Sequence, residues 1–236
     1  RMLNRAATGK QKIEVINAGV WGYTSCQVMK RYKKEIADLK PDAILLMSGW
    51  NDINKLRNSS INKKSQYCMN HHPVLVRSNI FRFLRLKLSK RFKNNPSELG
   101  VDFFYENAKY YLENLRVIIK DAGAKGTDVV LVSLPSLFET GDIDKFIRYE
   151  QFNGFSLQEI GYRKSAVMHI NALKKKVANE YKHVFYIDNG LSPLTAGKSE
   201  FFDDTIHPTG AGNRVLAFQL FKYLNERYKF GETFGQ

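Results

Sequence analysis

An aspartate and a histidine stand three residues apart near the end of the chain, in residues 202–210 (FDDTIHPTG). Positions i and i+3 of a helical turn lie on the same side, so Asp204 can hold one imidazole nitrogen of His207. The other nitrogen is then left to take a proton from a nucleophile. This is the base and its orienting acid in a nucleophilic hydrolase. Asp203 does not have this spacing, and we interpret it as a solvated or turn-capping acid.

Two further segments carry groups that could stabilise a developing negative charge. Residues 15–25 (VINAGVWGYTS) are an apolar strand, a turn with two glycines and then helix-start residues. Glycine lets the backbone approach a ligand and aim an N–H at it. Residues 44–52 (ILLMSGWND) are an apolar strand that ends in Gly-x-Asn-Asp, and the Asn51 amide there is a neutral donor suited to an oxyanion. The same patterns also fit an ordinary strand–turn–helix corner and an Asx turn or helix cap.

Together, and in this order, the three segments resemble the SGNH hydrolase family, also called GDSL esterases and lipases. That family has a Gly-Asp-Ser nucleophile turn, an oxyanion glycine, a Gly-x-Asn asparagine and a closing Asp-x-x-His. The resemblance runs from Asn17 to the helix after His207. It implies that Gly22 and Asn51 form the oxyanion hole and that Asp204 and His207 are the catalytic acid and base. It implies no cofactor.

One block of the family is missing, since no Gly-Asp-Ser occurs in the 236 residues. In the family this turn follows the first strand and precedes the block at Asn17 by some tens of residues. We therefore expect the nucleophile serine on a segment upstream of Arg1. Ser25 and Ser48 are the serines nearest the oxyanion segments, but they read as helix-start and strand-end residues. We do not expect either of them to be the nucleophile.

Apolar strands alternate with amphipathic helices along the chain, and the length suits one domain. The predicted strands are 12–17, 42–48, 128–134 and 184–188, and the predicted helices are 24–38, 102–122, 156–181 and 209–228. The continuous apolar run of 42–48 is typical of a parallel strand that is buried on both faces. The alternation predicts an α/β fold, a three-layer α/β/α sandwich with a parallel sheet. The resemblance implies the flavodoxin-like SGNH hydrolase version of it.

The family's sheet order places its first strand between 12–17 and 42–48. Without that strand two inner edges of the sheet are unpaired. Each unpaired buried backbone group costs about 1–3 kcal/mol, against a total stability of about 5–15 kcal/mol. We therefore expect residues 1–236 to be a single domain that lacks its first strand and nucleophile turn, both of which lie upstream.

Residues 53–100 are longer than an ordinary α/β connection, and we interpret them as an insertion or cap. Apolar residues recur in it at i+4 spacing among Arg and Lys: Val76, Ile80, Leu84, Leu88 and Phe92. This predicts a basic amphipathic helix at the site entrance, which either packs on the core or contacts an anionic membrane surface through 76–93. Residues 84–88 also alternate with period two, as an edge strand does.

The net charge of +14 fits an anionic partner, such as nucleic acid, anionic lipid or an acidic polymer. It also fits solvated helix faces, which we favour. No aromatic-basic motif of the nucleic-acid-binding kind occurs, so we expect no nucleic-acid partner. No run of eighteen apolar residues predicts a membrane span. An extracytoplasmic or membrane-associated location is favoured over a cytoplasmic one.

The cysteines and histidines outside the Asp-x-x-His segment predict no further site. Cys26 and Cys68 are too few for a disulfide framework and do not decide the redox compartment. His71 and His72 stand beside Cys68, but adjacent histidines rarely converge on one ion, so we expect no metal.

Trp21 and Trp50 flank the oxyanion residues and are candidates for the pocket wall. Simple packing in the fold is the alternative for both.

These features favour a serine-type ester hydrolase acting on a small-molecule or glycan ester. An acyltransferase or deacetylase acting on a cell-envelope polysaccharide would use the same site. A catalytically inactive binding module is the third interpretation. The sequence upstream of Arg1 separates it from the enzymes, because only they need a Gly-Asp-Ser there.

Overall fold

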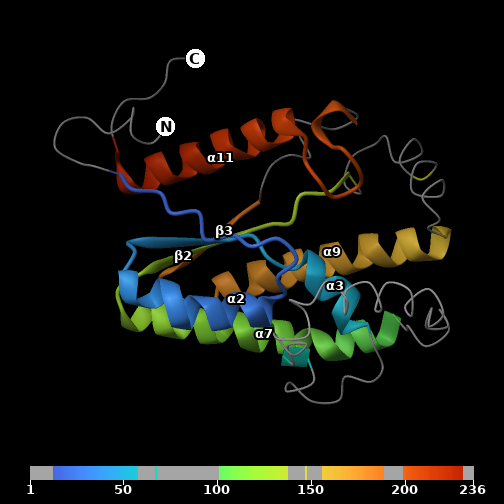
Figure 1. Cartoon of the computed structure of the whole chain (residues 1–236), viewed down its shortest axis with the longest axis horizontal. Coiled ribbons are helices and arrows are strands. Elements are labelled where there is room, and N and C mark those ends of the chain that lie inside the picture. The colour runs from blue at the N-terminus through green and yellow to red at the C-terminus, as the bar shows by residue number, and fades with distance from the viewer. Residues whose placement is uncertain are drawn as a thin grey trace, which may run out of the picture.

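A computed structural model describes residues 13–57, 67, 68, 101–137, 147, 156–188 and 199–230. At the centre of this part of the chain lies a parallel sheet (Figure 1), made of β1 (Ala43–Leu46), β2 (Asp128–Val132) and β3 (Val184–Ile187). The strands pair in the order β1–β2–β3, with Ala43 opposite Asp128 and Val129 opposite Val184. Parallel neighbours need crossover connections, which helices usually supply.

Helices cover both faces of the sheet. They are α2 (Ser25–Arg31), α3 (Trp50–Leu56), α7 (Val101–Ala124), α9 (Leu157–Ala178) and α11 (Gly210–Tyr228). Three short helical segments complete the described elements. The π-helix η1 (Tyr32–Ile36) and the 3-10 helix η2 (Ala37–Leu39) continue α2, and the 3-10 helix η5 (Ser199–Phe201) lies ahead of α11 in the chain. In Figure 1, α2, α3, α7 and α9 lie on one side of the sheet and α11 on the other. The predicted three-layer α/β/α sandwich is confirmed.

Strand β2 divides the core in two, because successive side chains of a strand point to opposite faces. Val129 and Leu131 join the large apolar cluster formed with α2, α7 and α9. Val130 and Val132 belong instead to a smaller cluster with α11. All four side chains are at most 1% exposed. This strand is therefore buried on both faces, as its apolar run predicts.

Strand β1 is less buried than its apolar run suggests. Leu46 is buried, but Leu45 is 41% exposed, and Met47, just beyond the strand, is 47% exposed. Among the described residues β1 pairs only with β2, so its other edge carries no strand. The apolar run correctly predicts a strand here, but the prediction of burial on both faces is wrong.

The strand predicted at 12–17 is not formed. Residues 13–20 have no regular secondary structure, and Val15 and Ile16 are 70% and 56% exposed. An apolar segment becomes a strand only when its backbone N–H and C=O groups find a partner. This segment does not pair with the open edge of β1, so nothing holds it as a strand.

The remaining predicted helices and strands are confirmed, with ends shifted by a few residues. The insertion at 53–100 begins with the end of α3, but most of it, including the predicted helix at 76–92, lies outside the described residues. Membrane contact through 76–93 therefore stays a prediction. None of the helices in the described part of the chain is both long and apolar enough to cross a membrane.

Gly49, between β1 and α3, allows a sharp test of the packing. Its φ is +139°, a region that favours glycine, and an added Cβ would lie 2.9 Å from Ile170 Cγ2 and 3.0 Å from Leu134 Cδ1. We expect Gly49→Ala to lower the free energy of unfolding by about 1–3 kcal/mol, measured by urea titration.

Gly161→Ala in α9 is the matched control. An added Cβ there meets nothing within 4 Å, and alanine is the better helix former, so stability should stay equal or rise. An equal loss in both variants would contradict this account of Gly49.

Candidate active site

The Asp-x-x-His segment forms a tight turn between η5 and α11. The predicted pairing is present, since His207 Nδ1 lies 2.6 Å from Asp204 Oδ2. The other carboxylate oxygen, Oδ1, accepts the backbone N–H groups of Ile206 and His207, each at 2.7 Å. This is an Asx turn, so the backbone itself fixes the side chain that orients the imidazole.

Because Asp204 is ionised, the proton shared by this pair belongs to the His207 ring. Burial by itself would raise the pKa of the carboxyl, but the hydrogen bonds from the His207 ring and from the Ile206 and His207 N–H groups outweigh it, and the pKa is lowered. An ionised carboxylate can only accept, so Nδ1 donates and Nε2 is the nitrogen that can take up a proton. The His207 side chain is 61% exposed, which leaves the ring accessible.

One backbone hydrogen bond holds this turn against the segment that follows β2, and a second closes the turn itself. The N–H of Leu137, which follows β2, donates to Thr205 O at 3.0 Å, and the Asp203 N–H donates to His207 O at 2.8 Å. Asp203 is exposed and stabilises the turn through its backbone, in line with its interpretation as a turn residue. The pair therefore lies at the sheet edge where α/β proteins build their sites.

The two predicted oxyanion segments meet at the carboxyl end of β1. The Tyr23 N–H donates to Val20 O at 3.4 Å, closing a β-turn whose third residue, Gly22, has φ +80°. A type II turn requires positive φ at that position. Asn51, near the start of α3, donates from Nδ2 to Tyr23 O at 3.1 Å. One amide hydrogen thus holds the glycine turn, and the other remains for a ligand.

Neither serine near these segments is placed to react. Ser25 is 1% exposed, and its hydroxyl lies 2.9 Å from the Tyr67 hydroxyl and 3.1 Å from Asn114 Nδ2. The hydroxyl of Ser48 is buried as well. Both are shielded from a substrate, in agreement with the sequence-based interpretation.

The two tryptophans differ in their surroundings. Trp50 is partly buried and packs against the large apolar cluster. Trp21 is 94% exposed, beside Gly22. Trp21 thus presents its ring to the surface, and the pocket-wall role of both tryptophans stays a prediction.

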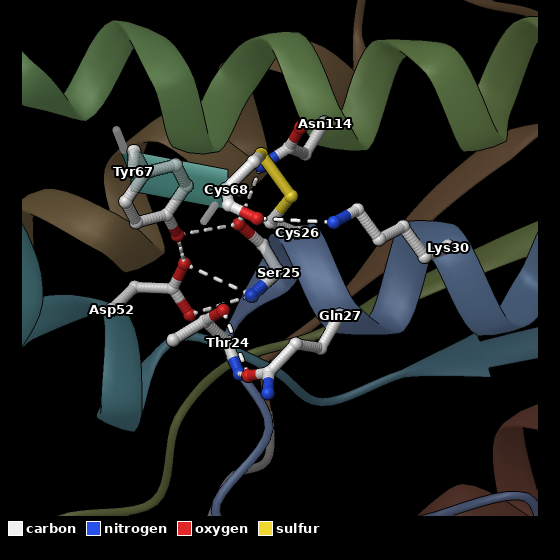
Figure 2. The surroundings of a disulfide bond; sticks show 9 residues. All are labelled: Thr24, Ser25, Cys26, Gln27, Lys30, Asp52, Tyr67, Cys68 and Asn114. Atoms are coloured by element: carbon white, nitrogen blue, oxygen red, sulfur yellow. Dashed lines mark hydrogen bonds between the residues drawn. A yellow bond between two sulfur atoms is a disulfide. The ribbon is translucent and has the colours of Figure 1, made fainter. Parts of the chain in front are cut away.

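A buried carboxylate behind the oxyanion residues was missed by the sequence reasoning. Asp52 is 0% exposed, and both of its oxygens accept the Ser25 N–H at 3.0 Å (Figure 2). It thereby joins the start of α3 to the start of α2. The only sequence signal was its place in Gly-x-Asn-Asp, which does not reveal the partner.

A buried lysine balances this carboxylate. Lys174 of α9 is 0% exposed, and its Nζ donates to Val132 O at 2.8 Å. Burial raises the pKa of Asp52, while the Ser25 hydrogen bonds and the charge of Lys174 act to lower it. Burial lowers the pKa of Lys174, and the charge of Asp52 acts to raise it.

Cys26 and Cys68 form a disulfide, with their Cα atoms 5.6 Å apart (Figure 2). This corrects the expectation that the two cysteines build no disulfide framework, because the bridge ties α2 to the segment that follows α3. Cys68 is therefore not a metal ligand. Within the described residues no group of three or more His, Cys, Asp or Glu could hold a metal ion; His71 and His72 lie outside them.

Comparison with protein families gives a match over residues 1–215, to the model of the GDSL-like Lipase/Acylhydrolase family. The chain belongs to this family. The resemblance that the sequence motifs carry is confirmed, and so is the fold class. A comparison with curated proteins finds no match.

Solved structures of similar fold share little sequence with this family member. A catalytic mutant of Axe2, an acetylxylan esterase from Geobacillus stearothermophilus, is 15% identical, with 92% of this chain and 74% of that chain covered and a TM-score of 0.54. A GDSL-like lipase from Bacteroides thetaiotaomicron VPI-5482 is 15% identical, with 87% and 73% covered and a TM-score of 0.49. At such identity the Axe2 likeness shows the fold alone.

The lowered pKa of Asp204 predicts a pH-dependent stability. Since the folded-state pKa lies below the ordinary value of 3.8, the stabilisation is present above that value and is lost as the pH falls through the folded-state pKa. We expect Asp204→Asn to unfold more easily than wild type near pH 7, with the difference shrinking toward pH 3 in urea titrations.

Asp203→Asn, at the exposed neighbouring position, is the control and should follow wild type. If the difference between Asp204→Asn and wild type were the same at every pH, the charge of Asp204 would not be its source.

Proposed function

We propose that the protein is a serine-type ester hydrolase that removes acyl or acetyl groups from a small molecule or glycan. The observation that carries this is the Asp204–His207 pair at the same sheet edge as the contact between Asn51 and the Gly22 turn. Membership of an acylhydrolase family supports an ester as the substrate. The acetylxylan esterase Axe2, which has a similar fold, makes a glycan acetyl ester a reasonable first substrate.

Each residue has a defined role in this reaction. His207 Nε2 accepts the proton of the attacking serine and returns it to the leaving alcohol, while Asp204 holds the imidazole in the required tautomer and stabilises its charged form. The Gly22 N–H and the second Asn51 amide hydrogen donate to the oxygen that becomes negative at the tetrahedral stage. Removal of one such donor typically costs about 3–4 kcal/mol of transition-state stabilisation.

The attacking serine is placed, in this proposal, on a strand and turn that precede Arg1. Ser25 and Ser48 are shielded. Among the described residues β1 has a strand on one edge only, and its Leu45 side chain is exposed. A strand paired in parallel with the other edge would end at the carboxyl side of the sheet, beside Asn51 and the Asp204–His207 pair. The Cys26–Cys68 disulfide supports a location in an oxidising compartment outside the cytoplasm.

Labelling of the full-length protein with a fluorophosphonate probe tests this function. The probe reacts with an activated serine, and peptide mapping should find the label on a serine upstream of Arg1, with none in a His207→Ala variant. A folded full-length protein that takes up no label would support the inactive binding module. A label on Ser25 or Ser48 would contradict the proposed position of the nucleophile.

Replacement of Asn51 tests the oxyanion hole separately. Asn51→Ala should lower kcat about 10²–10³-fold with little change in KM, because the amide bond to the oxyanion strengthens in the transition state. Steady-state hydrolysis of an acetyl ester measures both constants.

Asn54→Ala is the control, an exposed asparagine of the same helix, and should keep wild-type kinetics. A raised KM at unchanged kcat in Asn51→Ala would assign Asn51 to substrate binding and not to the oxyanion.

A further inference from the structure

We propose that Tyr67, anchored by the Cys26–Cys68 disulfide, is a positioning residue that sets the geometry between the two oxyanion donors. The proposal rests on the function proposed above for Gly22 and Asn51. Tyr67 touches neither donor. It acts through a buried chain of hydrogen bonds that joins it to Asp52 and Ser25 (Figure 2).

The two donors stand on different parts of the fold, so their separation has to be fixed by contacts between those parts. The Gly22 turn leads directly into α2, which begins at Ser25, and Asn51 is the second residue of α3. Asp52, the next residue of α3, holds the Ser25 N–H with both carboxylate oxygens. Together with the direct hydrogen bond from Asn51 Nδ2 to Tyr23 O, the Asp52 carboxylate therefore sets the position of one donor relative to the other.

Tyr67 completes a directed chain of hydrogen bonds around this carboxylate. Its hydroxyl donates to Asp52 Oδ1. Because a phenol has one proton, the Ser25 hydroxyl at 2.9 Å must donate to the Tyr67 oxygen. The Ser25 oxygen in turn accepts from Asn114 Nδ2 at 3.1 Å. Each group thus donates to the next one along the chain: Asn114 to Ser25, Ser25 to Tyr67, and Tyr67 to Asp52.

The disulfide holds this chain together next to its central contact. Cys26 follows Ser25 and Cys68 follows Tyr67, so the covalent bridge lies beside the hydrogen bond between the two hydroxyls (Figure 2). Tyr67 is 0% exposed, and Lys30 Nζ donates to Cys68 O at 3.0 Å. These contacts hold Tyr67, which belongs to neither α2 nor α3, against the Asp52 carboxylate that joins the two helices.

Two consequences follow from this arrangement. Without the Tyr67 hydroxyl, the buried Asp52 carboxylate loses a donor and the Ser25 hydroxyl loses its acceptor, which loosens the start of α2. Without the disulfide, the segment that carries Tyr67 loses its covalent link to α2. Either change should misplace the oxyanion donors and lower kcat, while the ground-state affinity for the ester changes little.

The first test replaces the hydroxyl in the full-length protein. Tyr67→Phe should lower kcat for an acetyl ester about tenfold at nearly unchanged KM. The matched control is Tyr32→Phe, since the Tyr32 hydroxyl also donates to a carboxylate, Asp121 Oδ2, at 2.7 Å but joins η1 to α7. It should keep wild-type kcat. An equal loss in both variants would overturn the proposal.

A double-mutant cycle separates positioning from a general loss of stability. If Tyr67 acts through the oxyanion hole, Tyr67→Phe should cost less in an Asn51→Ala background than in wild type, because contacting or coupled sites are not additive. The same loss in both backgrounds would overturn the positioning role.

Reduction of the disulfide tests the anchor without a variant of Tyr67, and it decides the case if Tyr67→Phe does not fold. A phosphine reductant should lower the kcat of wild type about tenfold, and the Cys26→Ala/Cys68→Ala protein should start at the lower value and not respond. Full kcat after complete reduction, verified by alkylation and mass spectrometry, would overturn the proposal. Wild type that hydrolyses no ester at all would overturn the proposed function together with it.

Discussion

The buried carboxylate of Asp52 is the interaction on which the geometry of the site depends. It comes from α3 and holds the first residue of α2 by its backbone N–H. Asn51 is the second residue of α3, and α2 directly follows the Gly22 turn. A buried charge is tolerated only when hydrogen bonds replace the lost water. Ser25, Tyr67 and the start of α2, where partial positive charge gathers, supply that replacement.

Lys174 connects the buried Asp52 carboxylate to the sheet. Its Nζ donates to Val132 O at the end of β2, and its charge acts on Asp52. Loss of one member of a buried pair of opposite charges typically costs about 3–5 kcal/mol, because the other is left uncompensated. The carboxyl end of β2 is thus tied to α3 and α9, and through Leu137 to the turn with the Asp204–His207 pair. Both halves of the candidate site are held by contacts at one edge of the sheet.

Local sequence patterns predicted the parts of the molecule whose causes are local. The apolar run of β2, the helical periodicity of α7 and the i, i+3 pairing of Asp204 and His207 all depend on neighbours in the chain, and all are present. The order of the motifs also led to the correct family. The rule that sites gather at the carboxyl ends of parallel strands places Asn51 just beyond β1. It does not by itself bring Tyr23 there, because residues 13–20 form no strand.

The sequence-based predictions that were wrong, and the features that they missed, all concern contacts between distant segments. The strand expected at 12–17 needed a partner that the chain does not bring to it, and the outer face of β1 stays exposed for the same reason. The Cys26–Cys68 bridge spans 42 residues, a distance over which spacing says nothing about pairing. The environment of Asp52 depends on Tyr67, Ser25 and Asn114 meeting in three dimensions. The periodicity of a sequence carries no information about such contacts between distant residues.

The central claim is that Gly22 and Asn51 face the same oxygen of a substrate whose chemistry His207 drives. A crystal structure of the full-length protein carrying a covalent phosphonate on its reactive serine tests this directly. We expect the phosphoryl oxygen about 2.7–3.1 Å from both the Gly22 N–H nitrogen and Asn51 Nδ2, with His207 Nε2 beside the serine oxygen. A phosphoryl oxygen directed away from both donors, or a phosphonate bound out of reach of His207, would contradict the account.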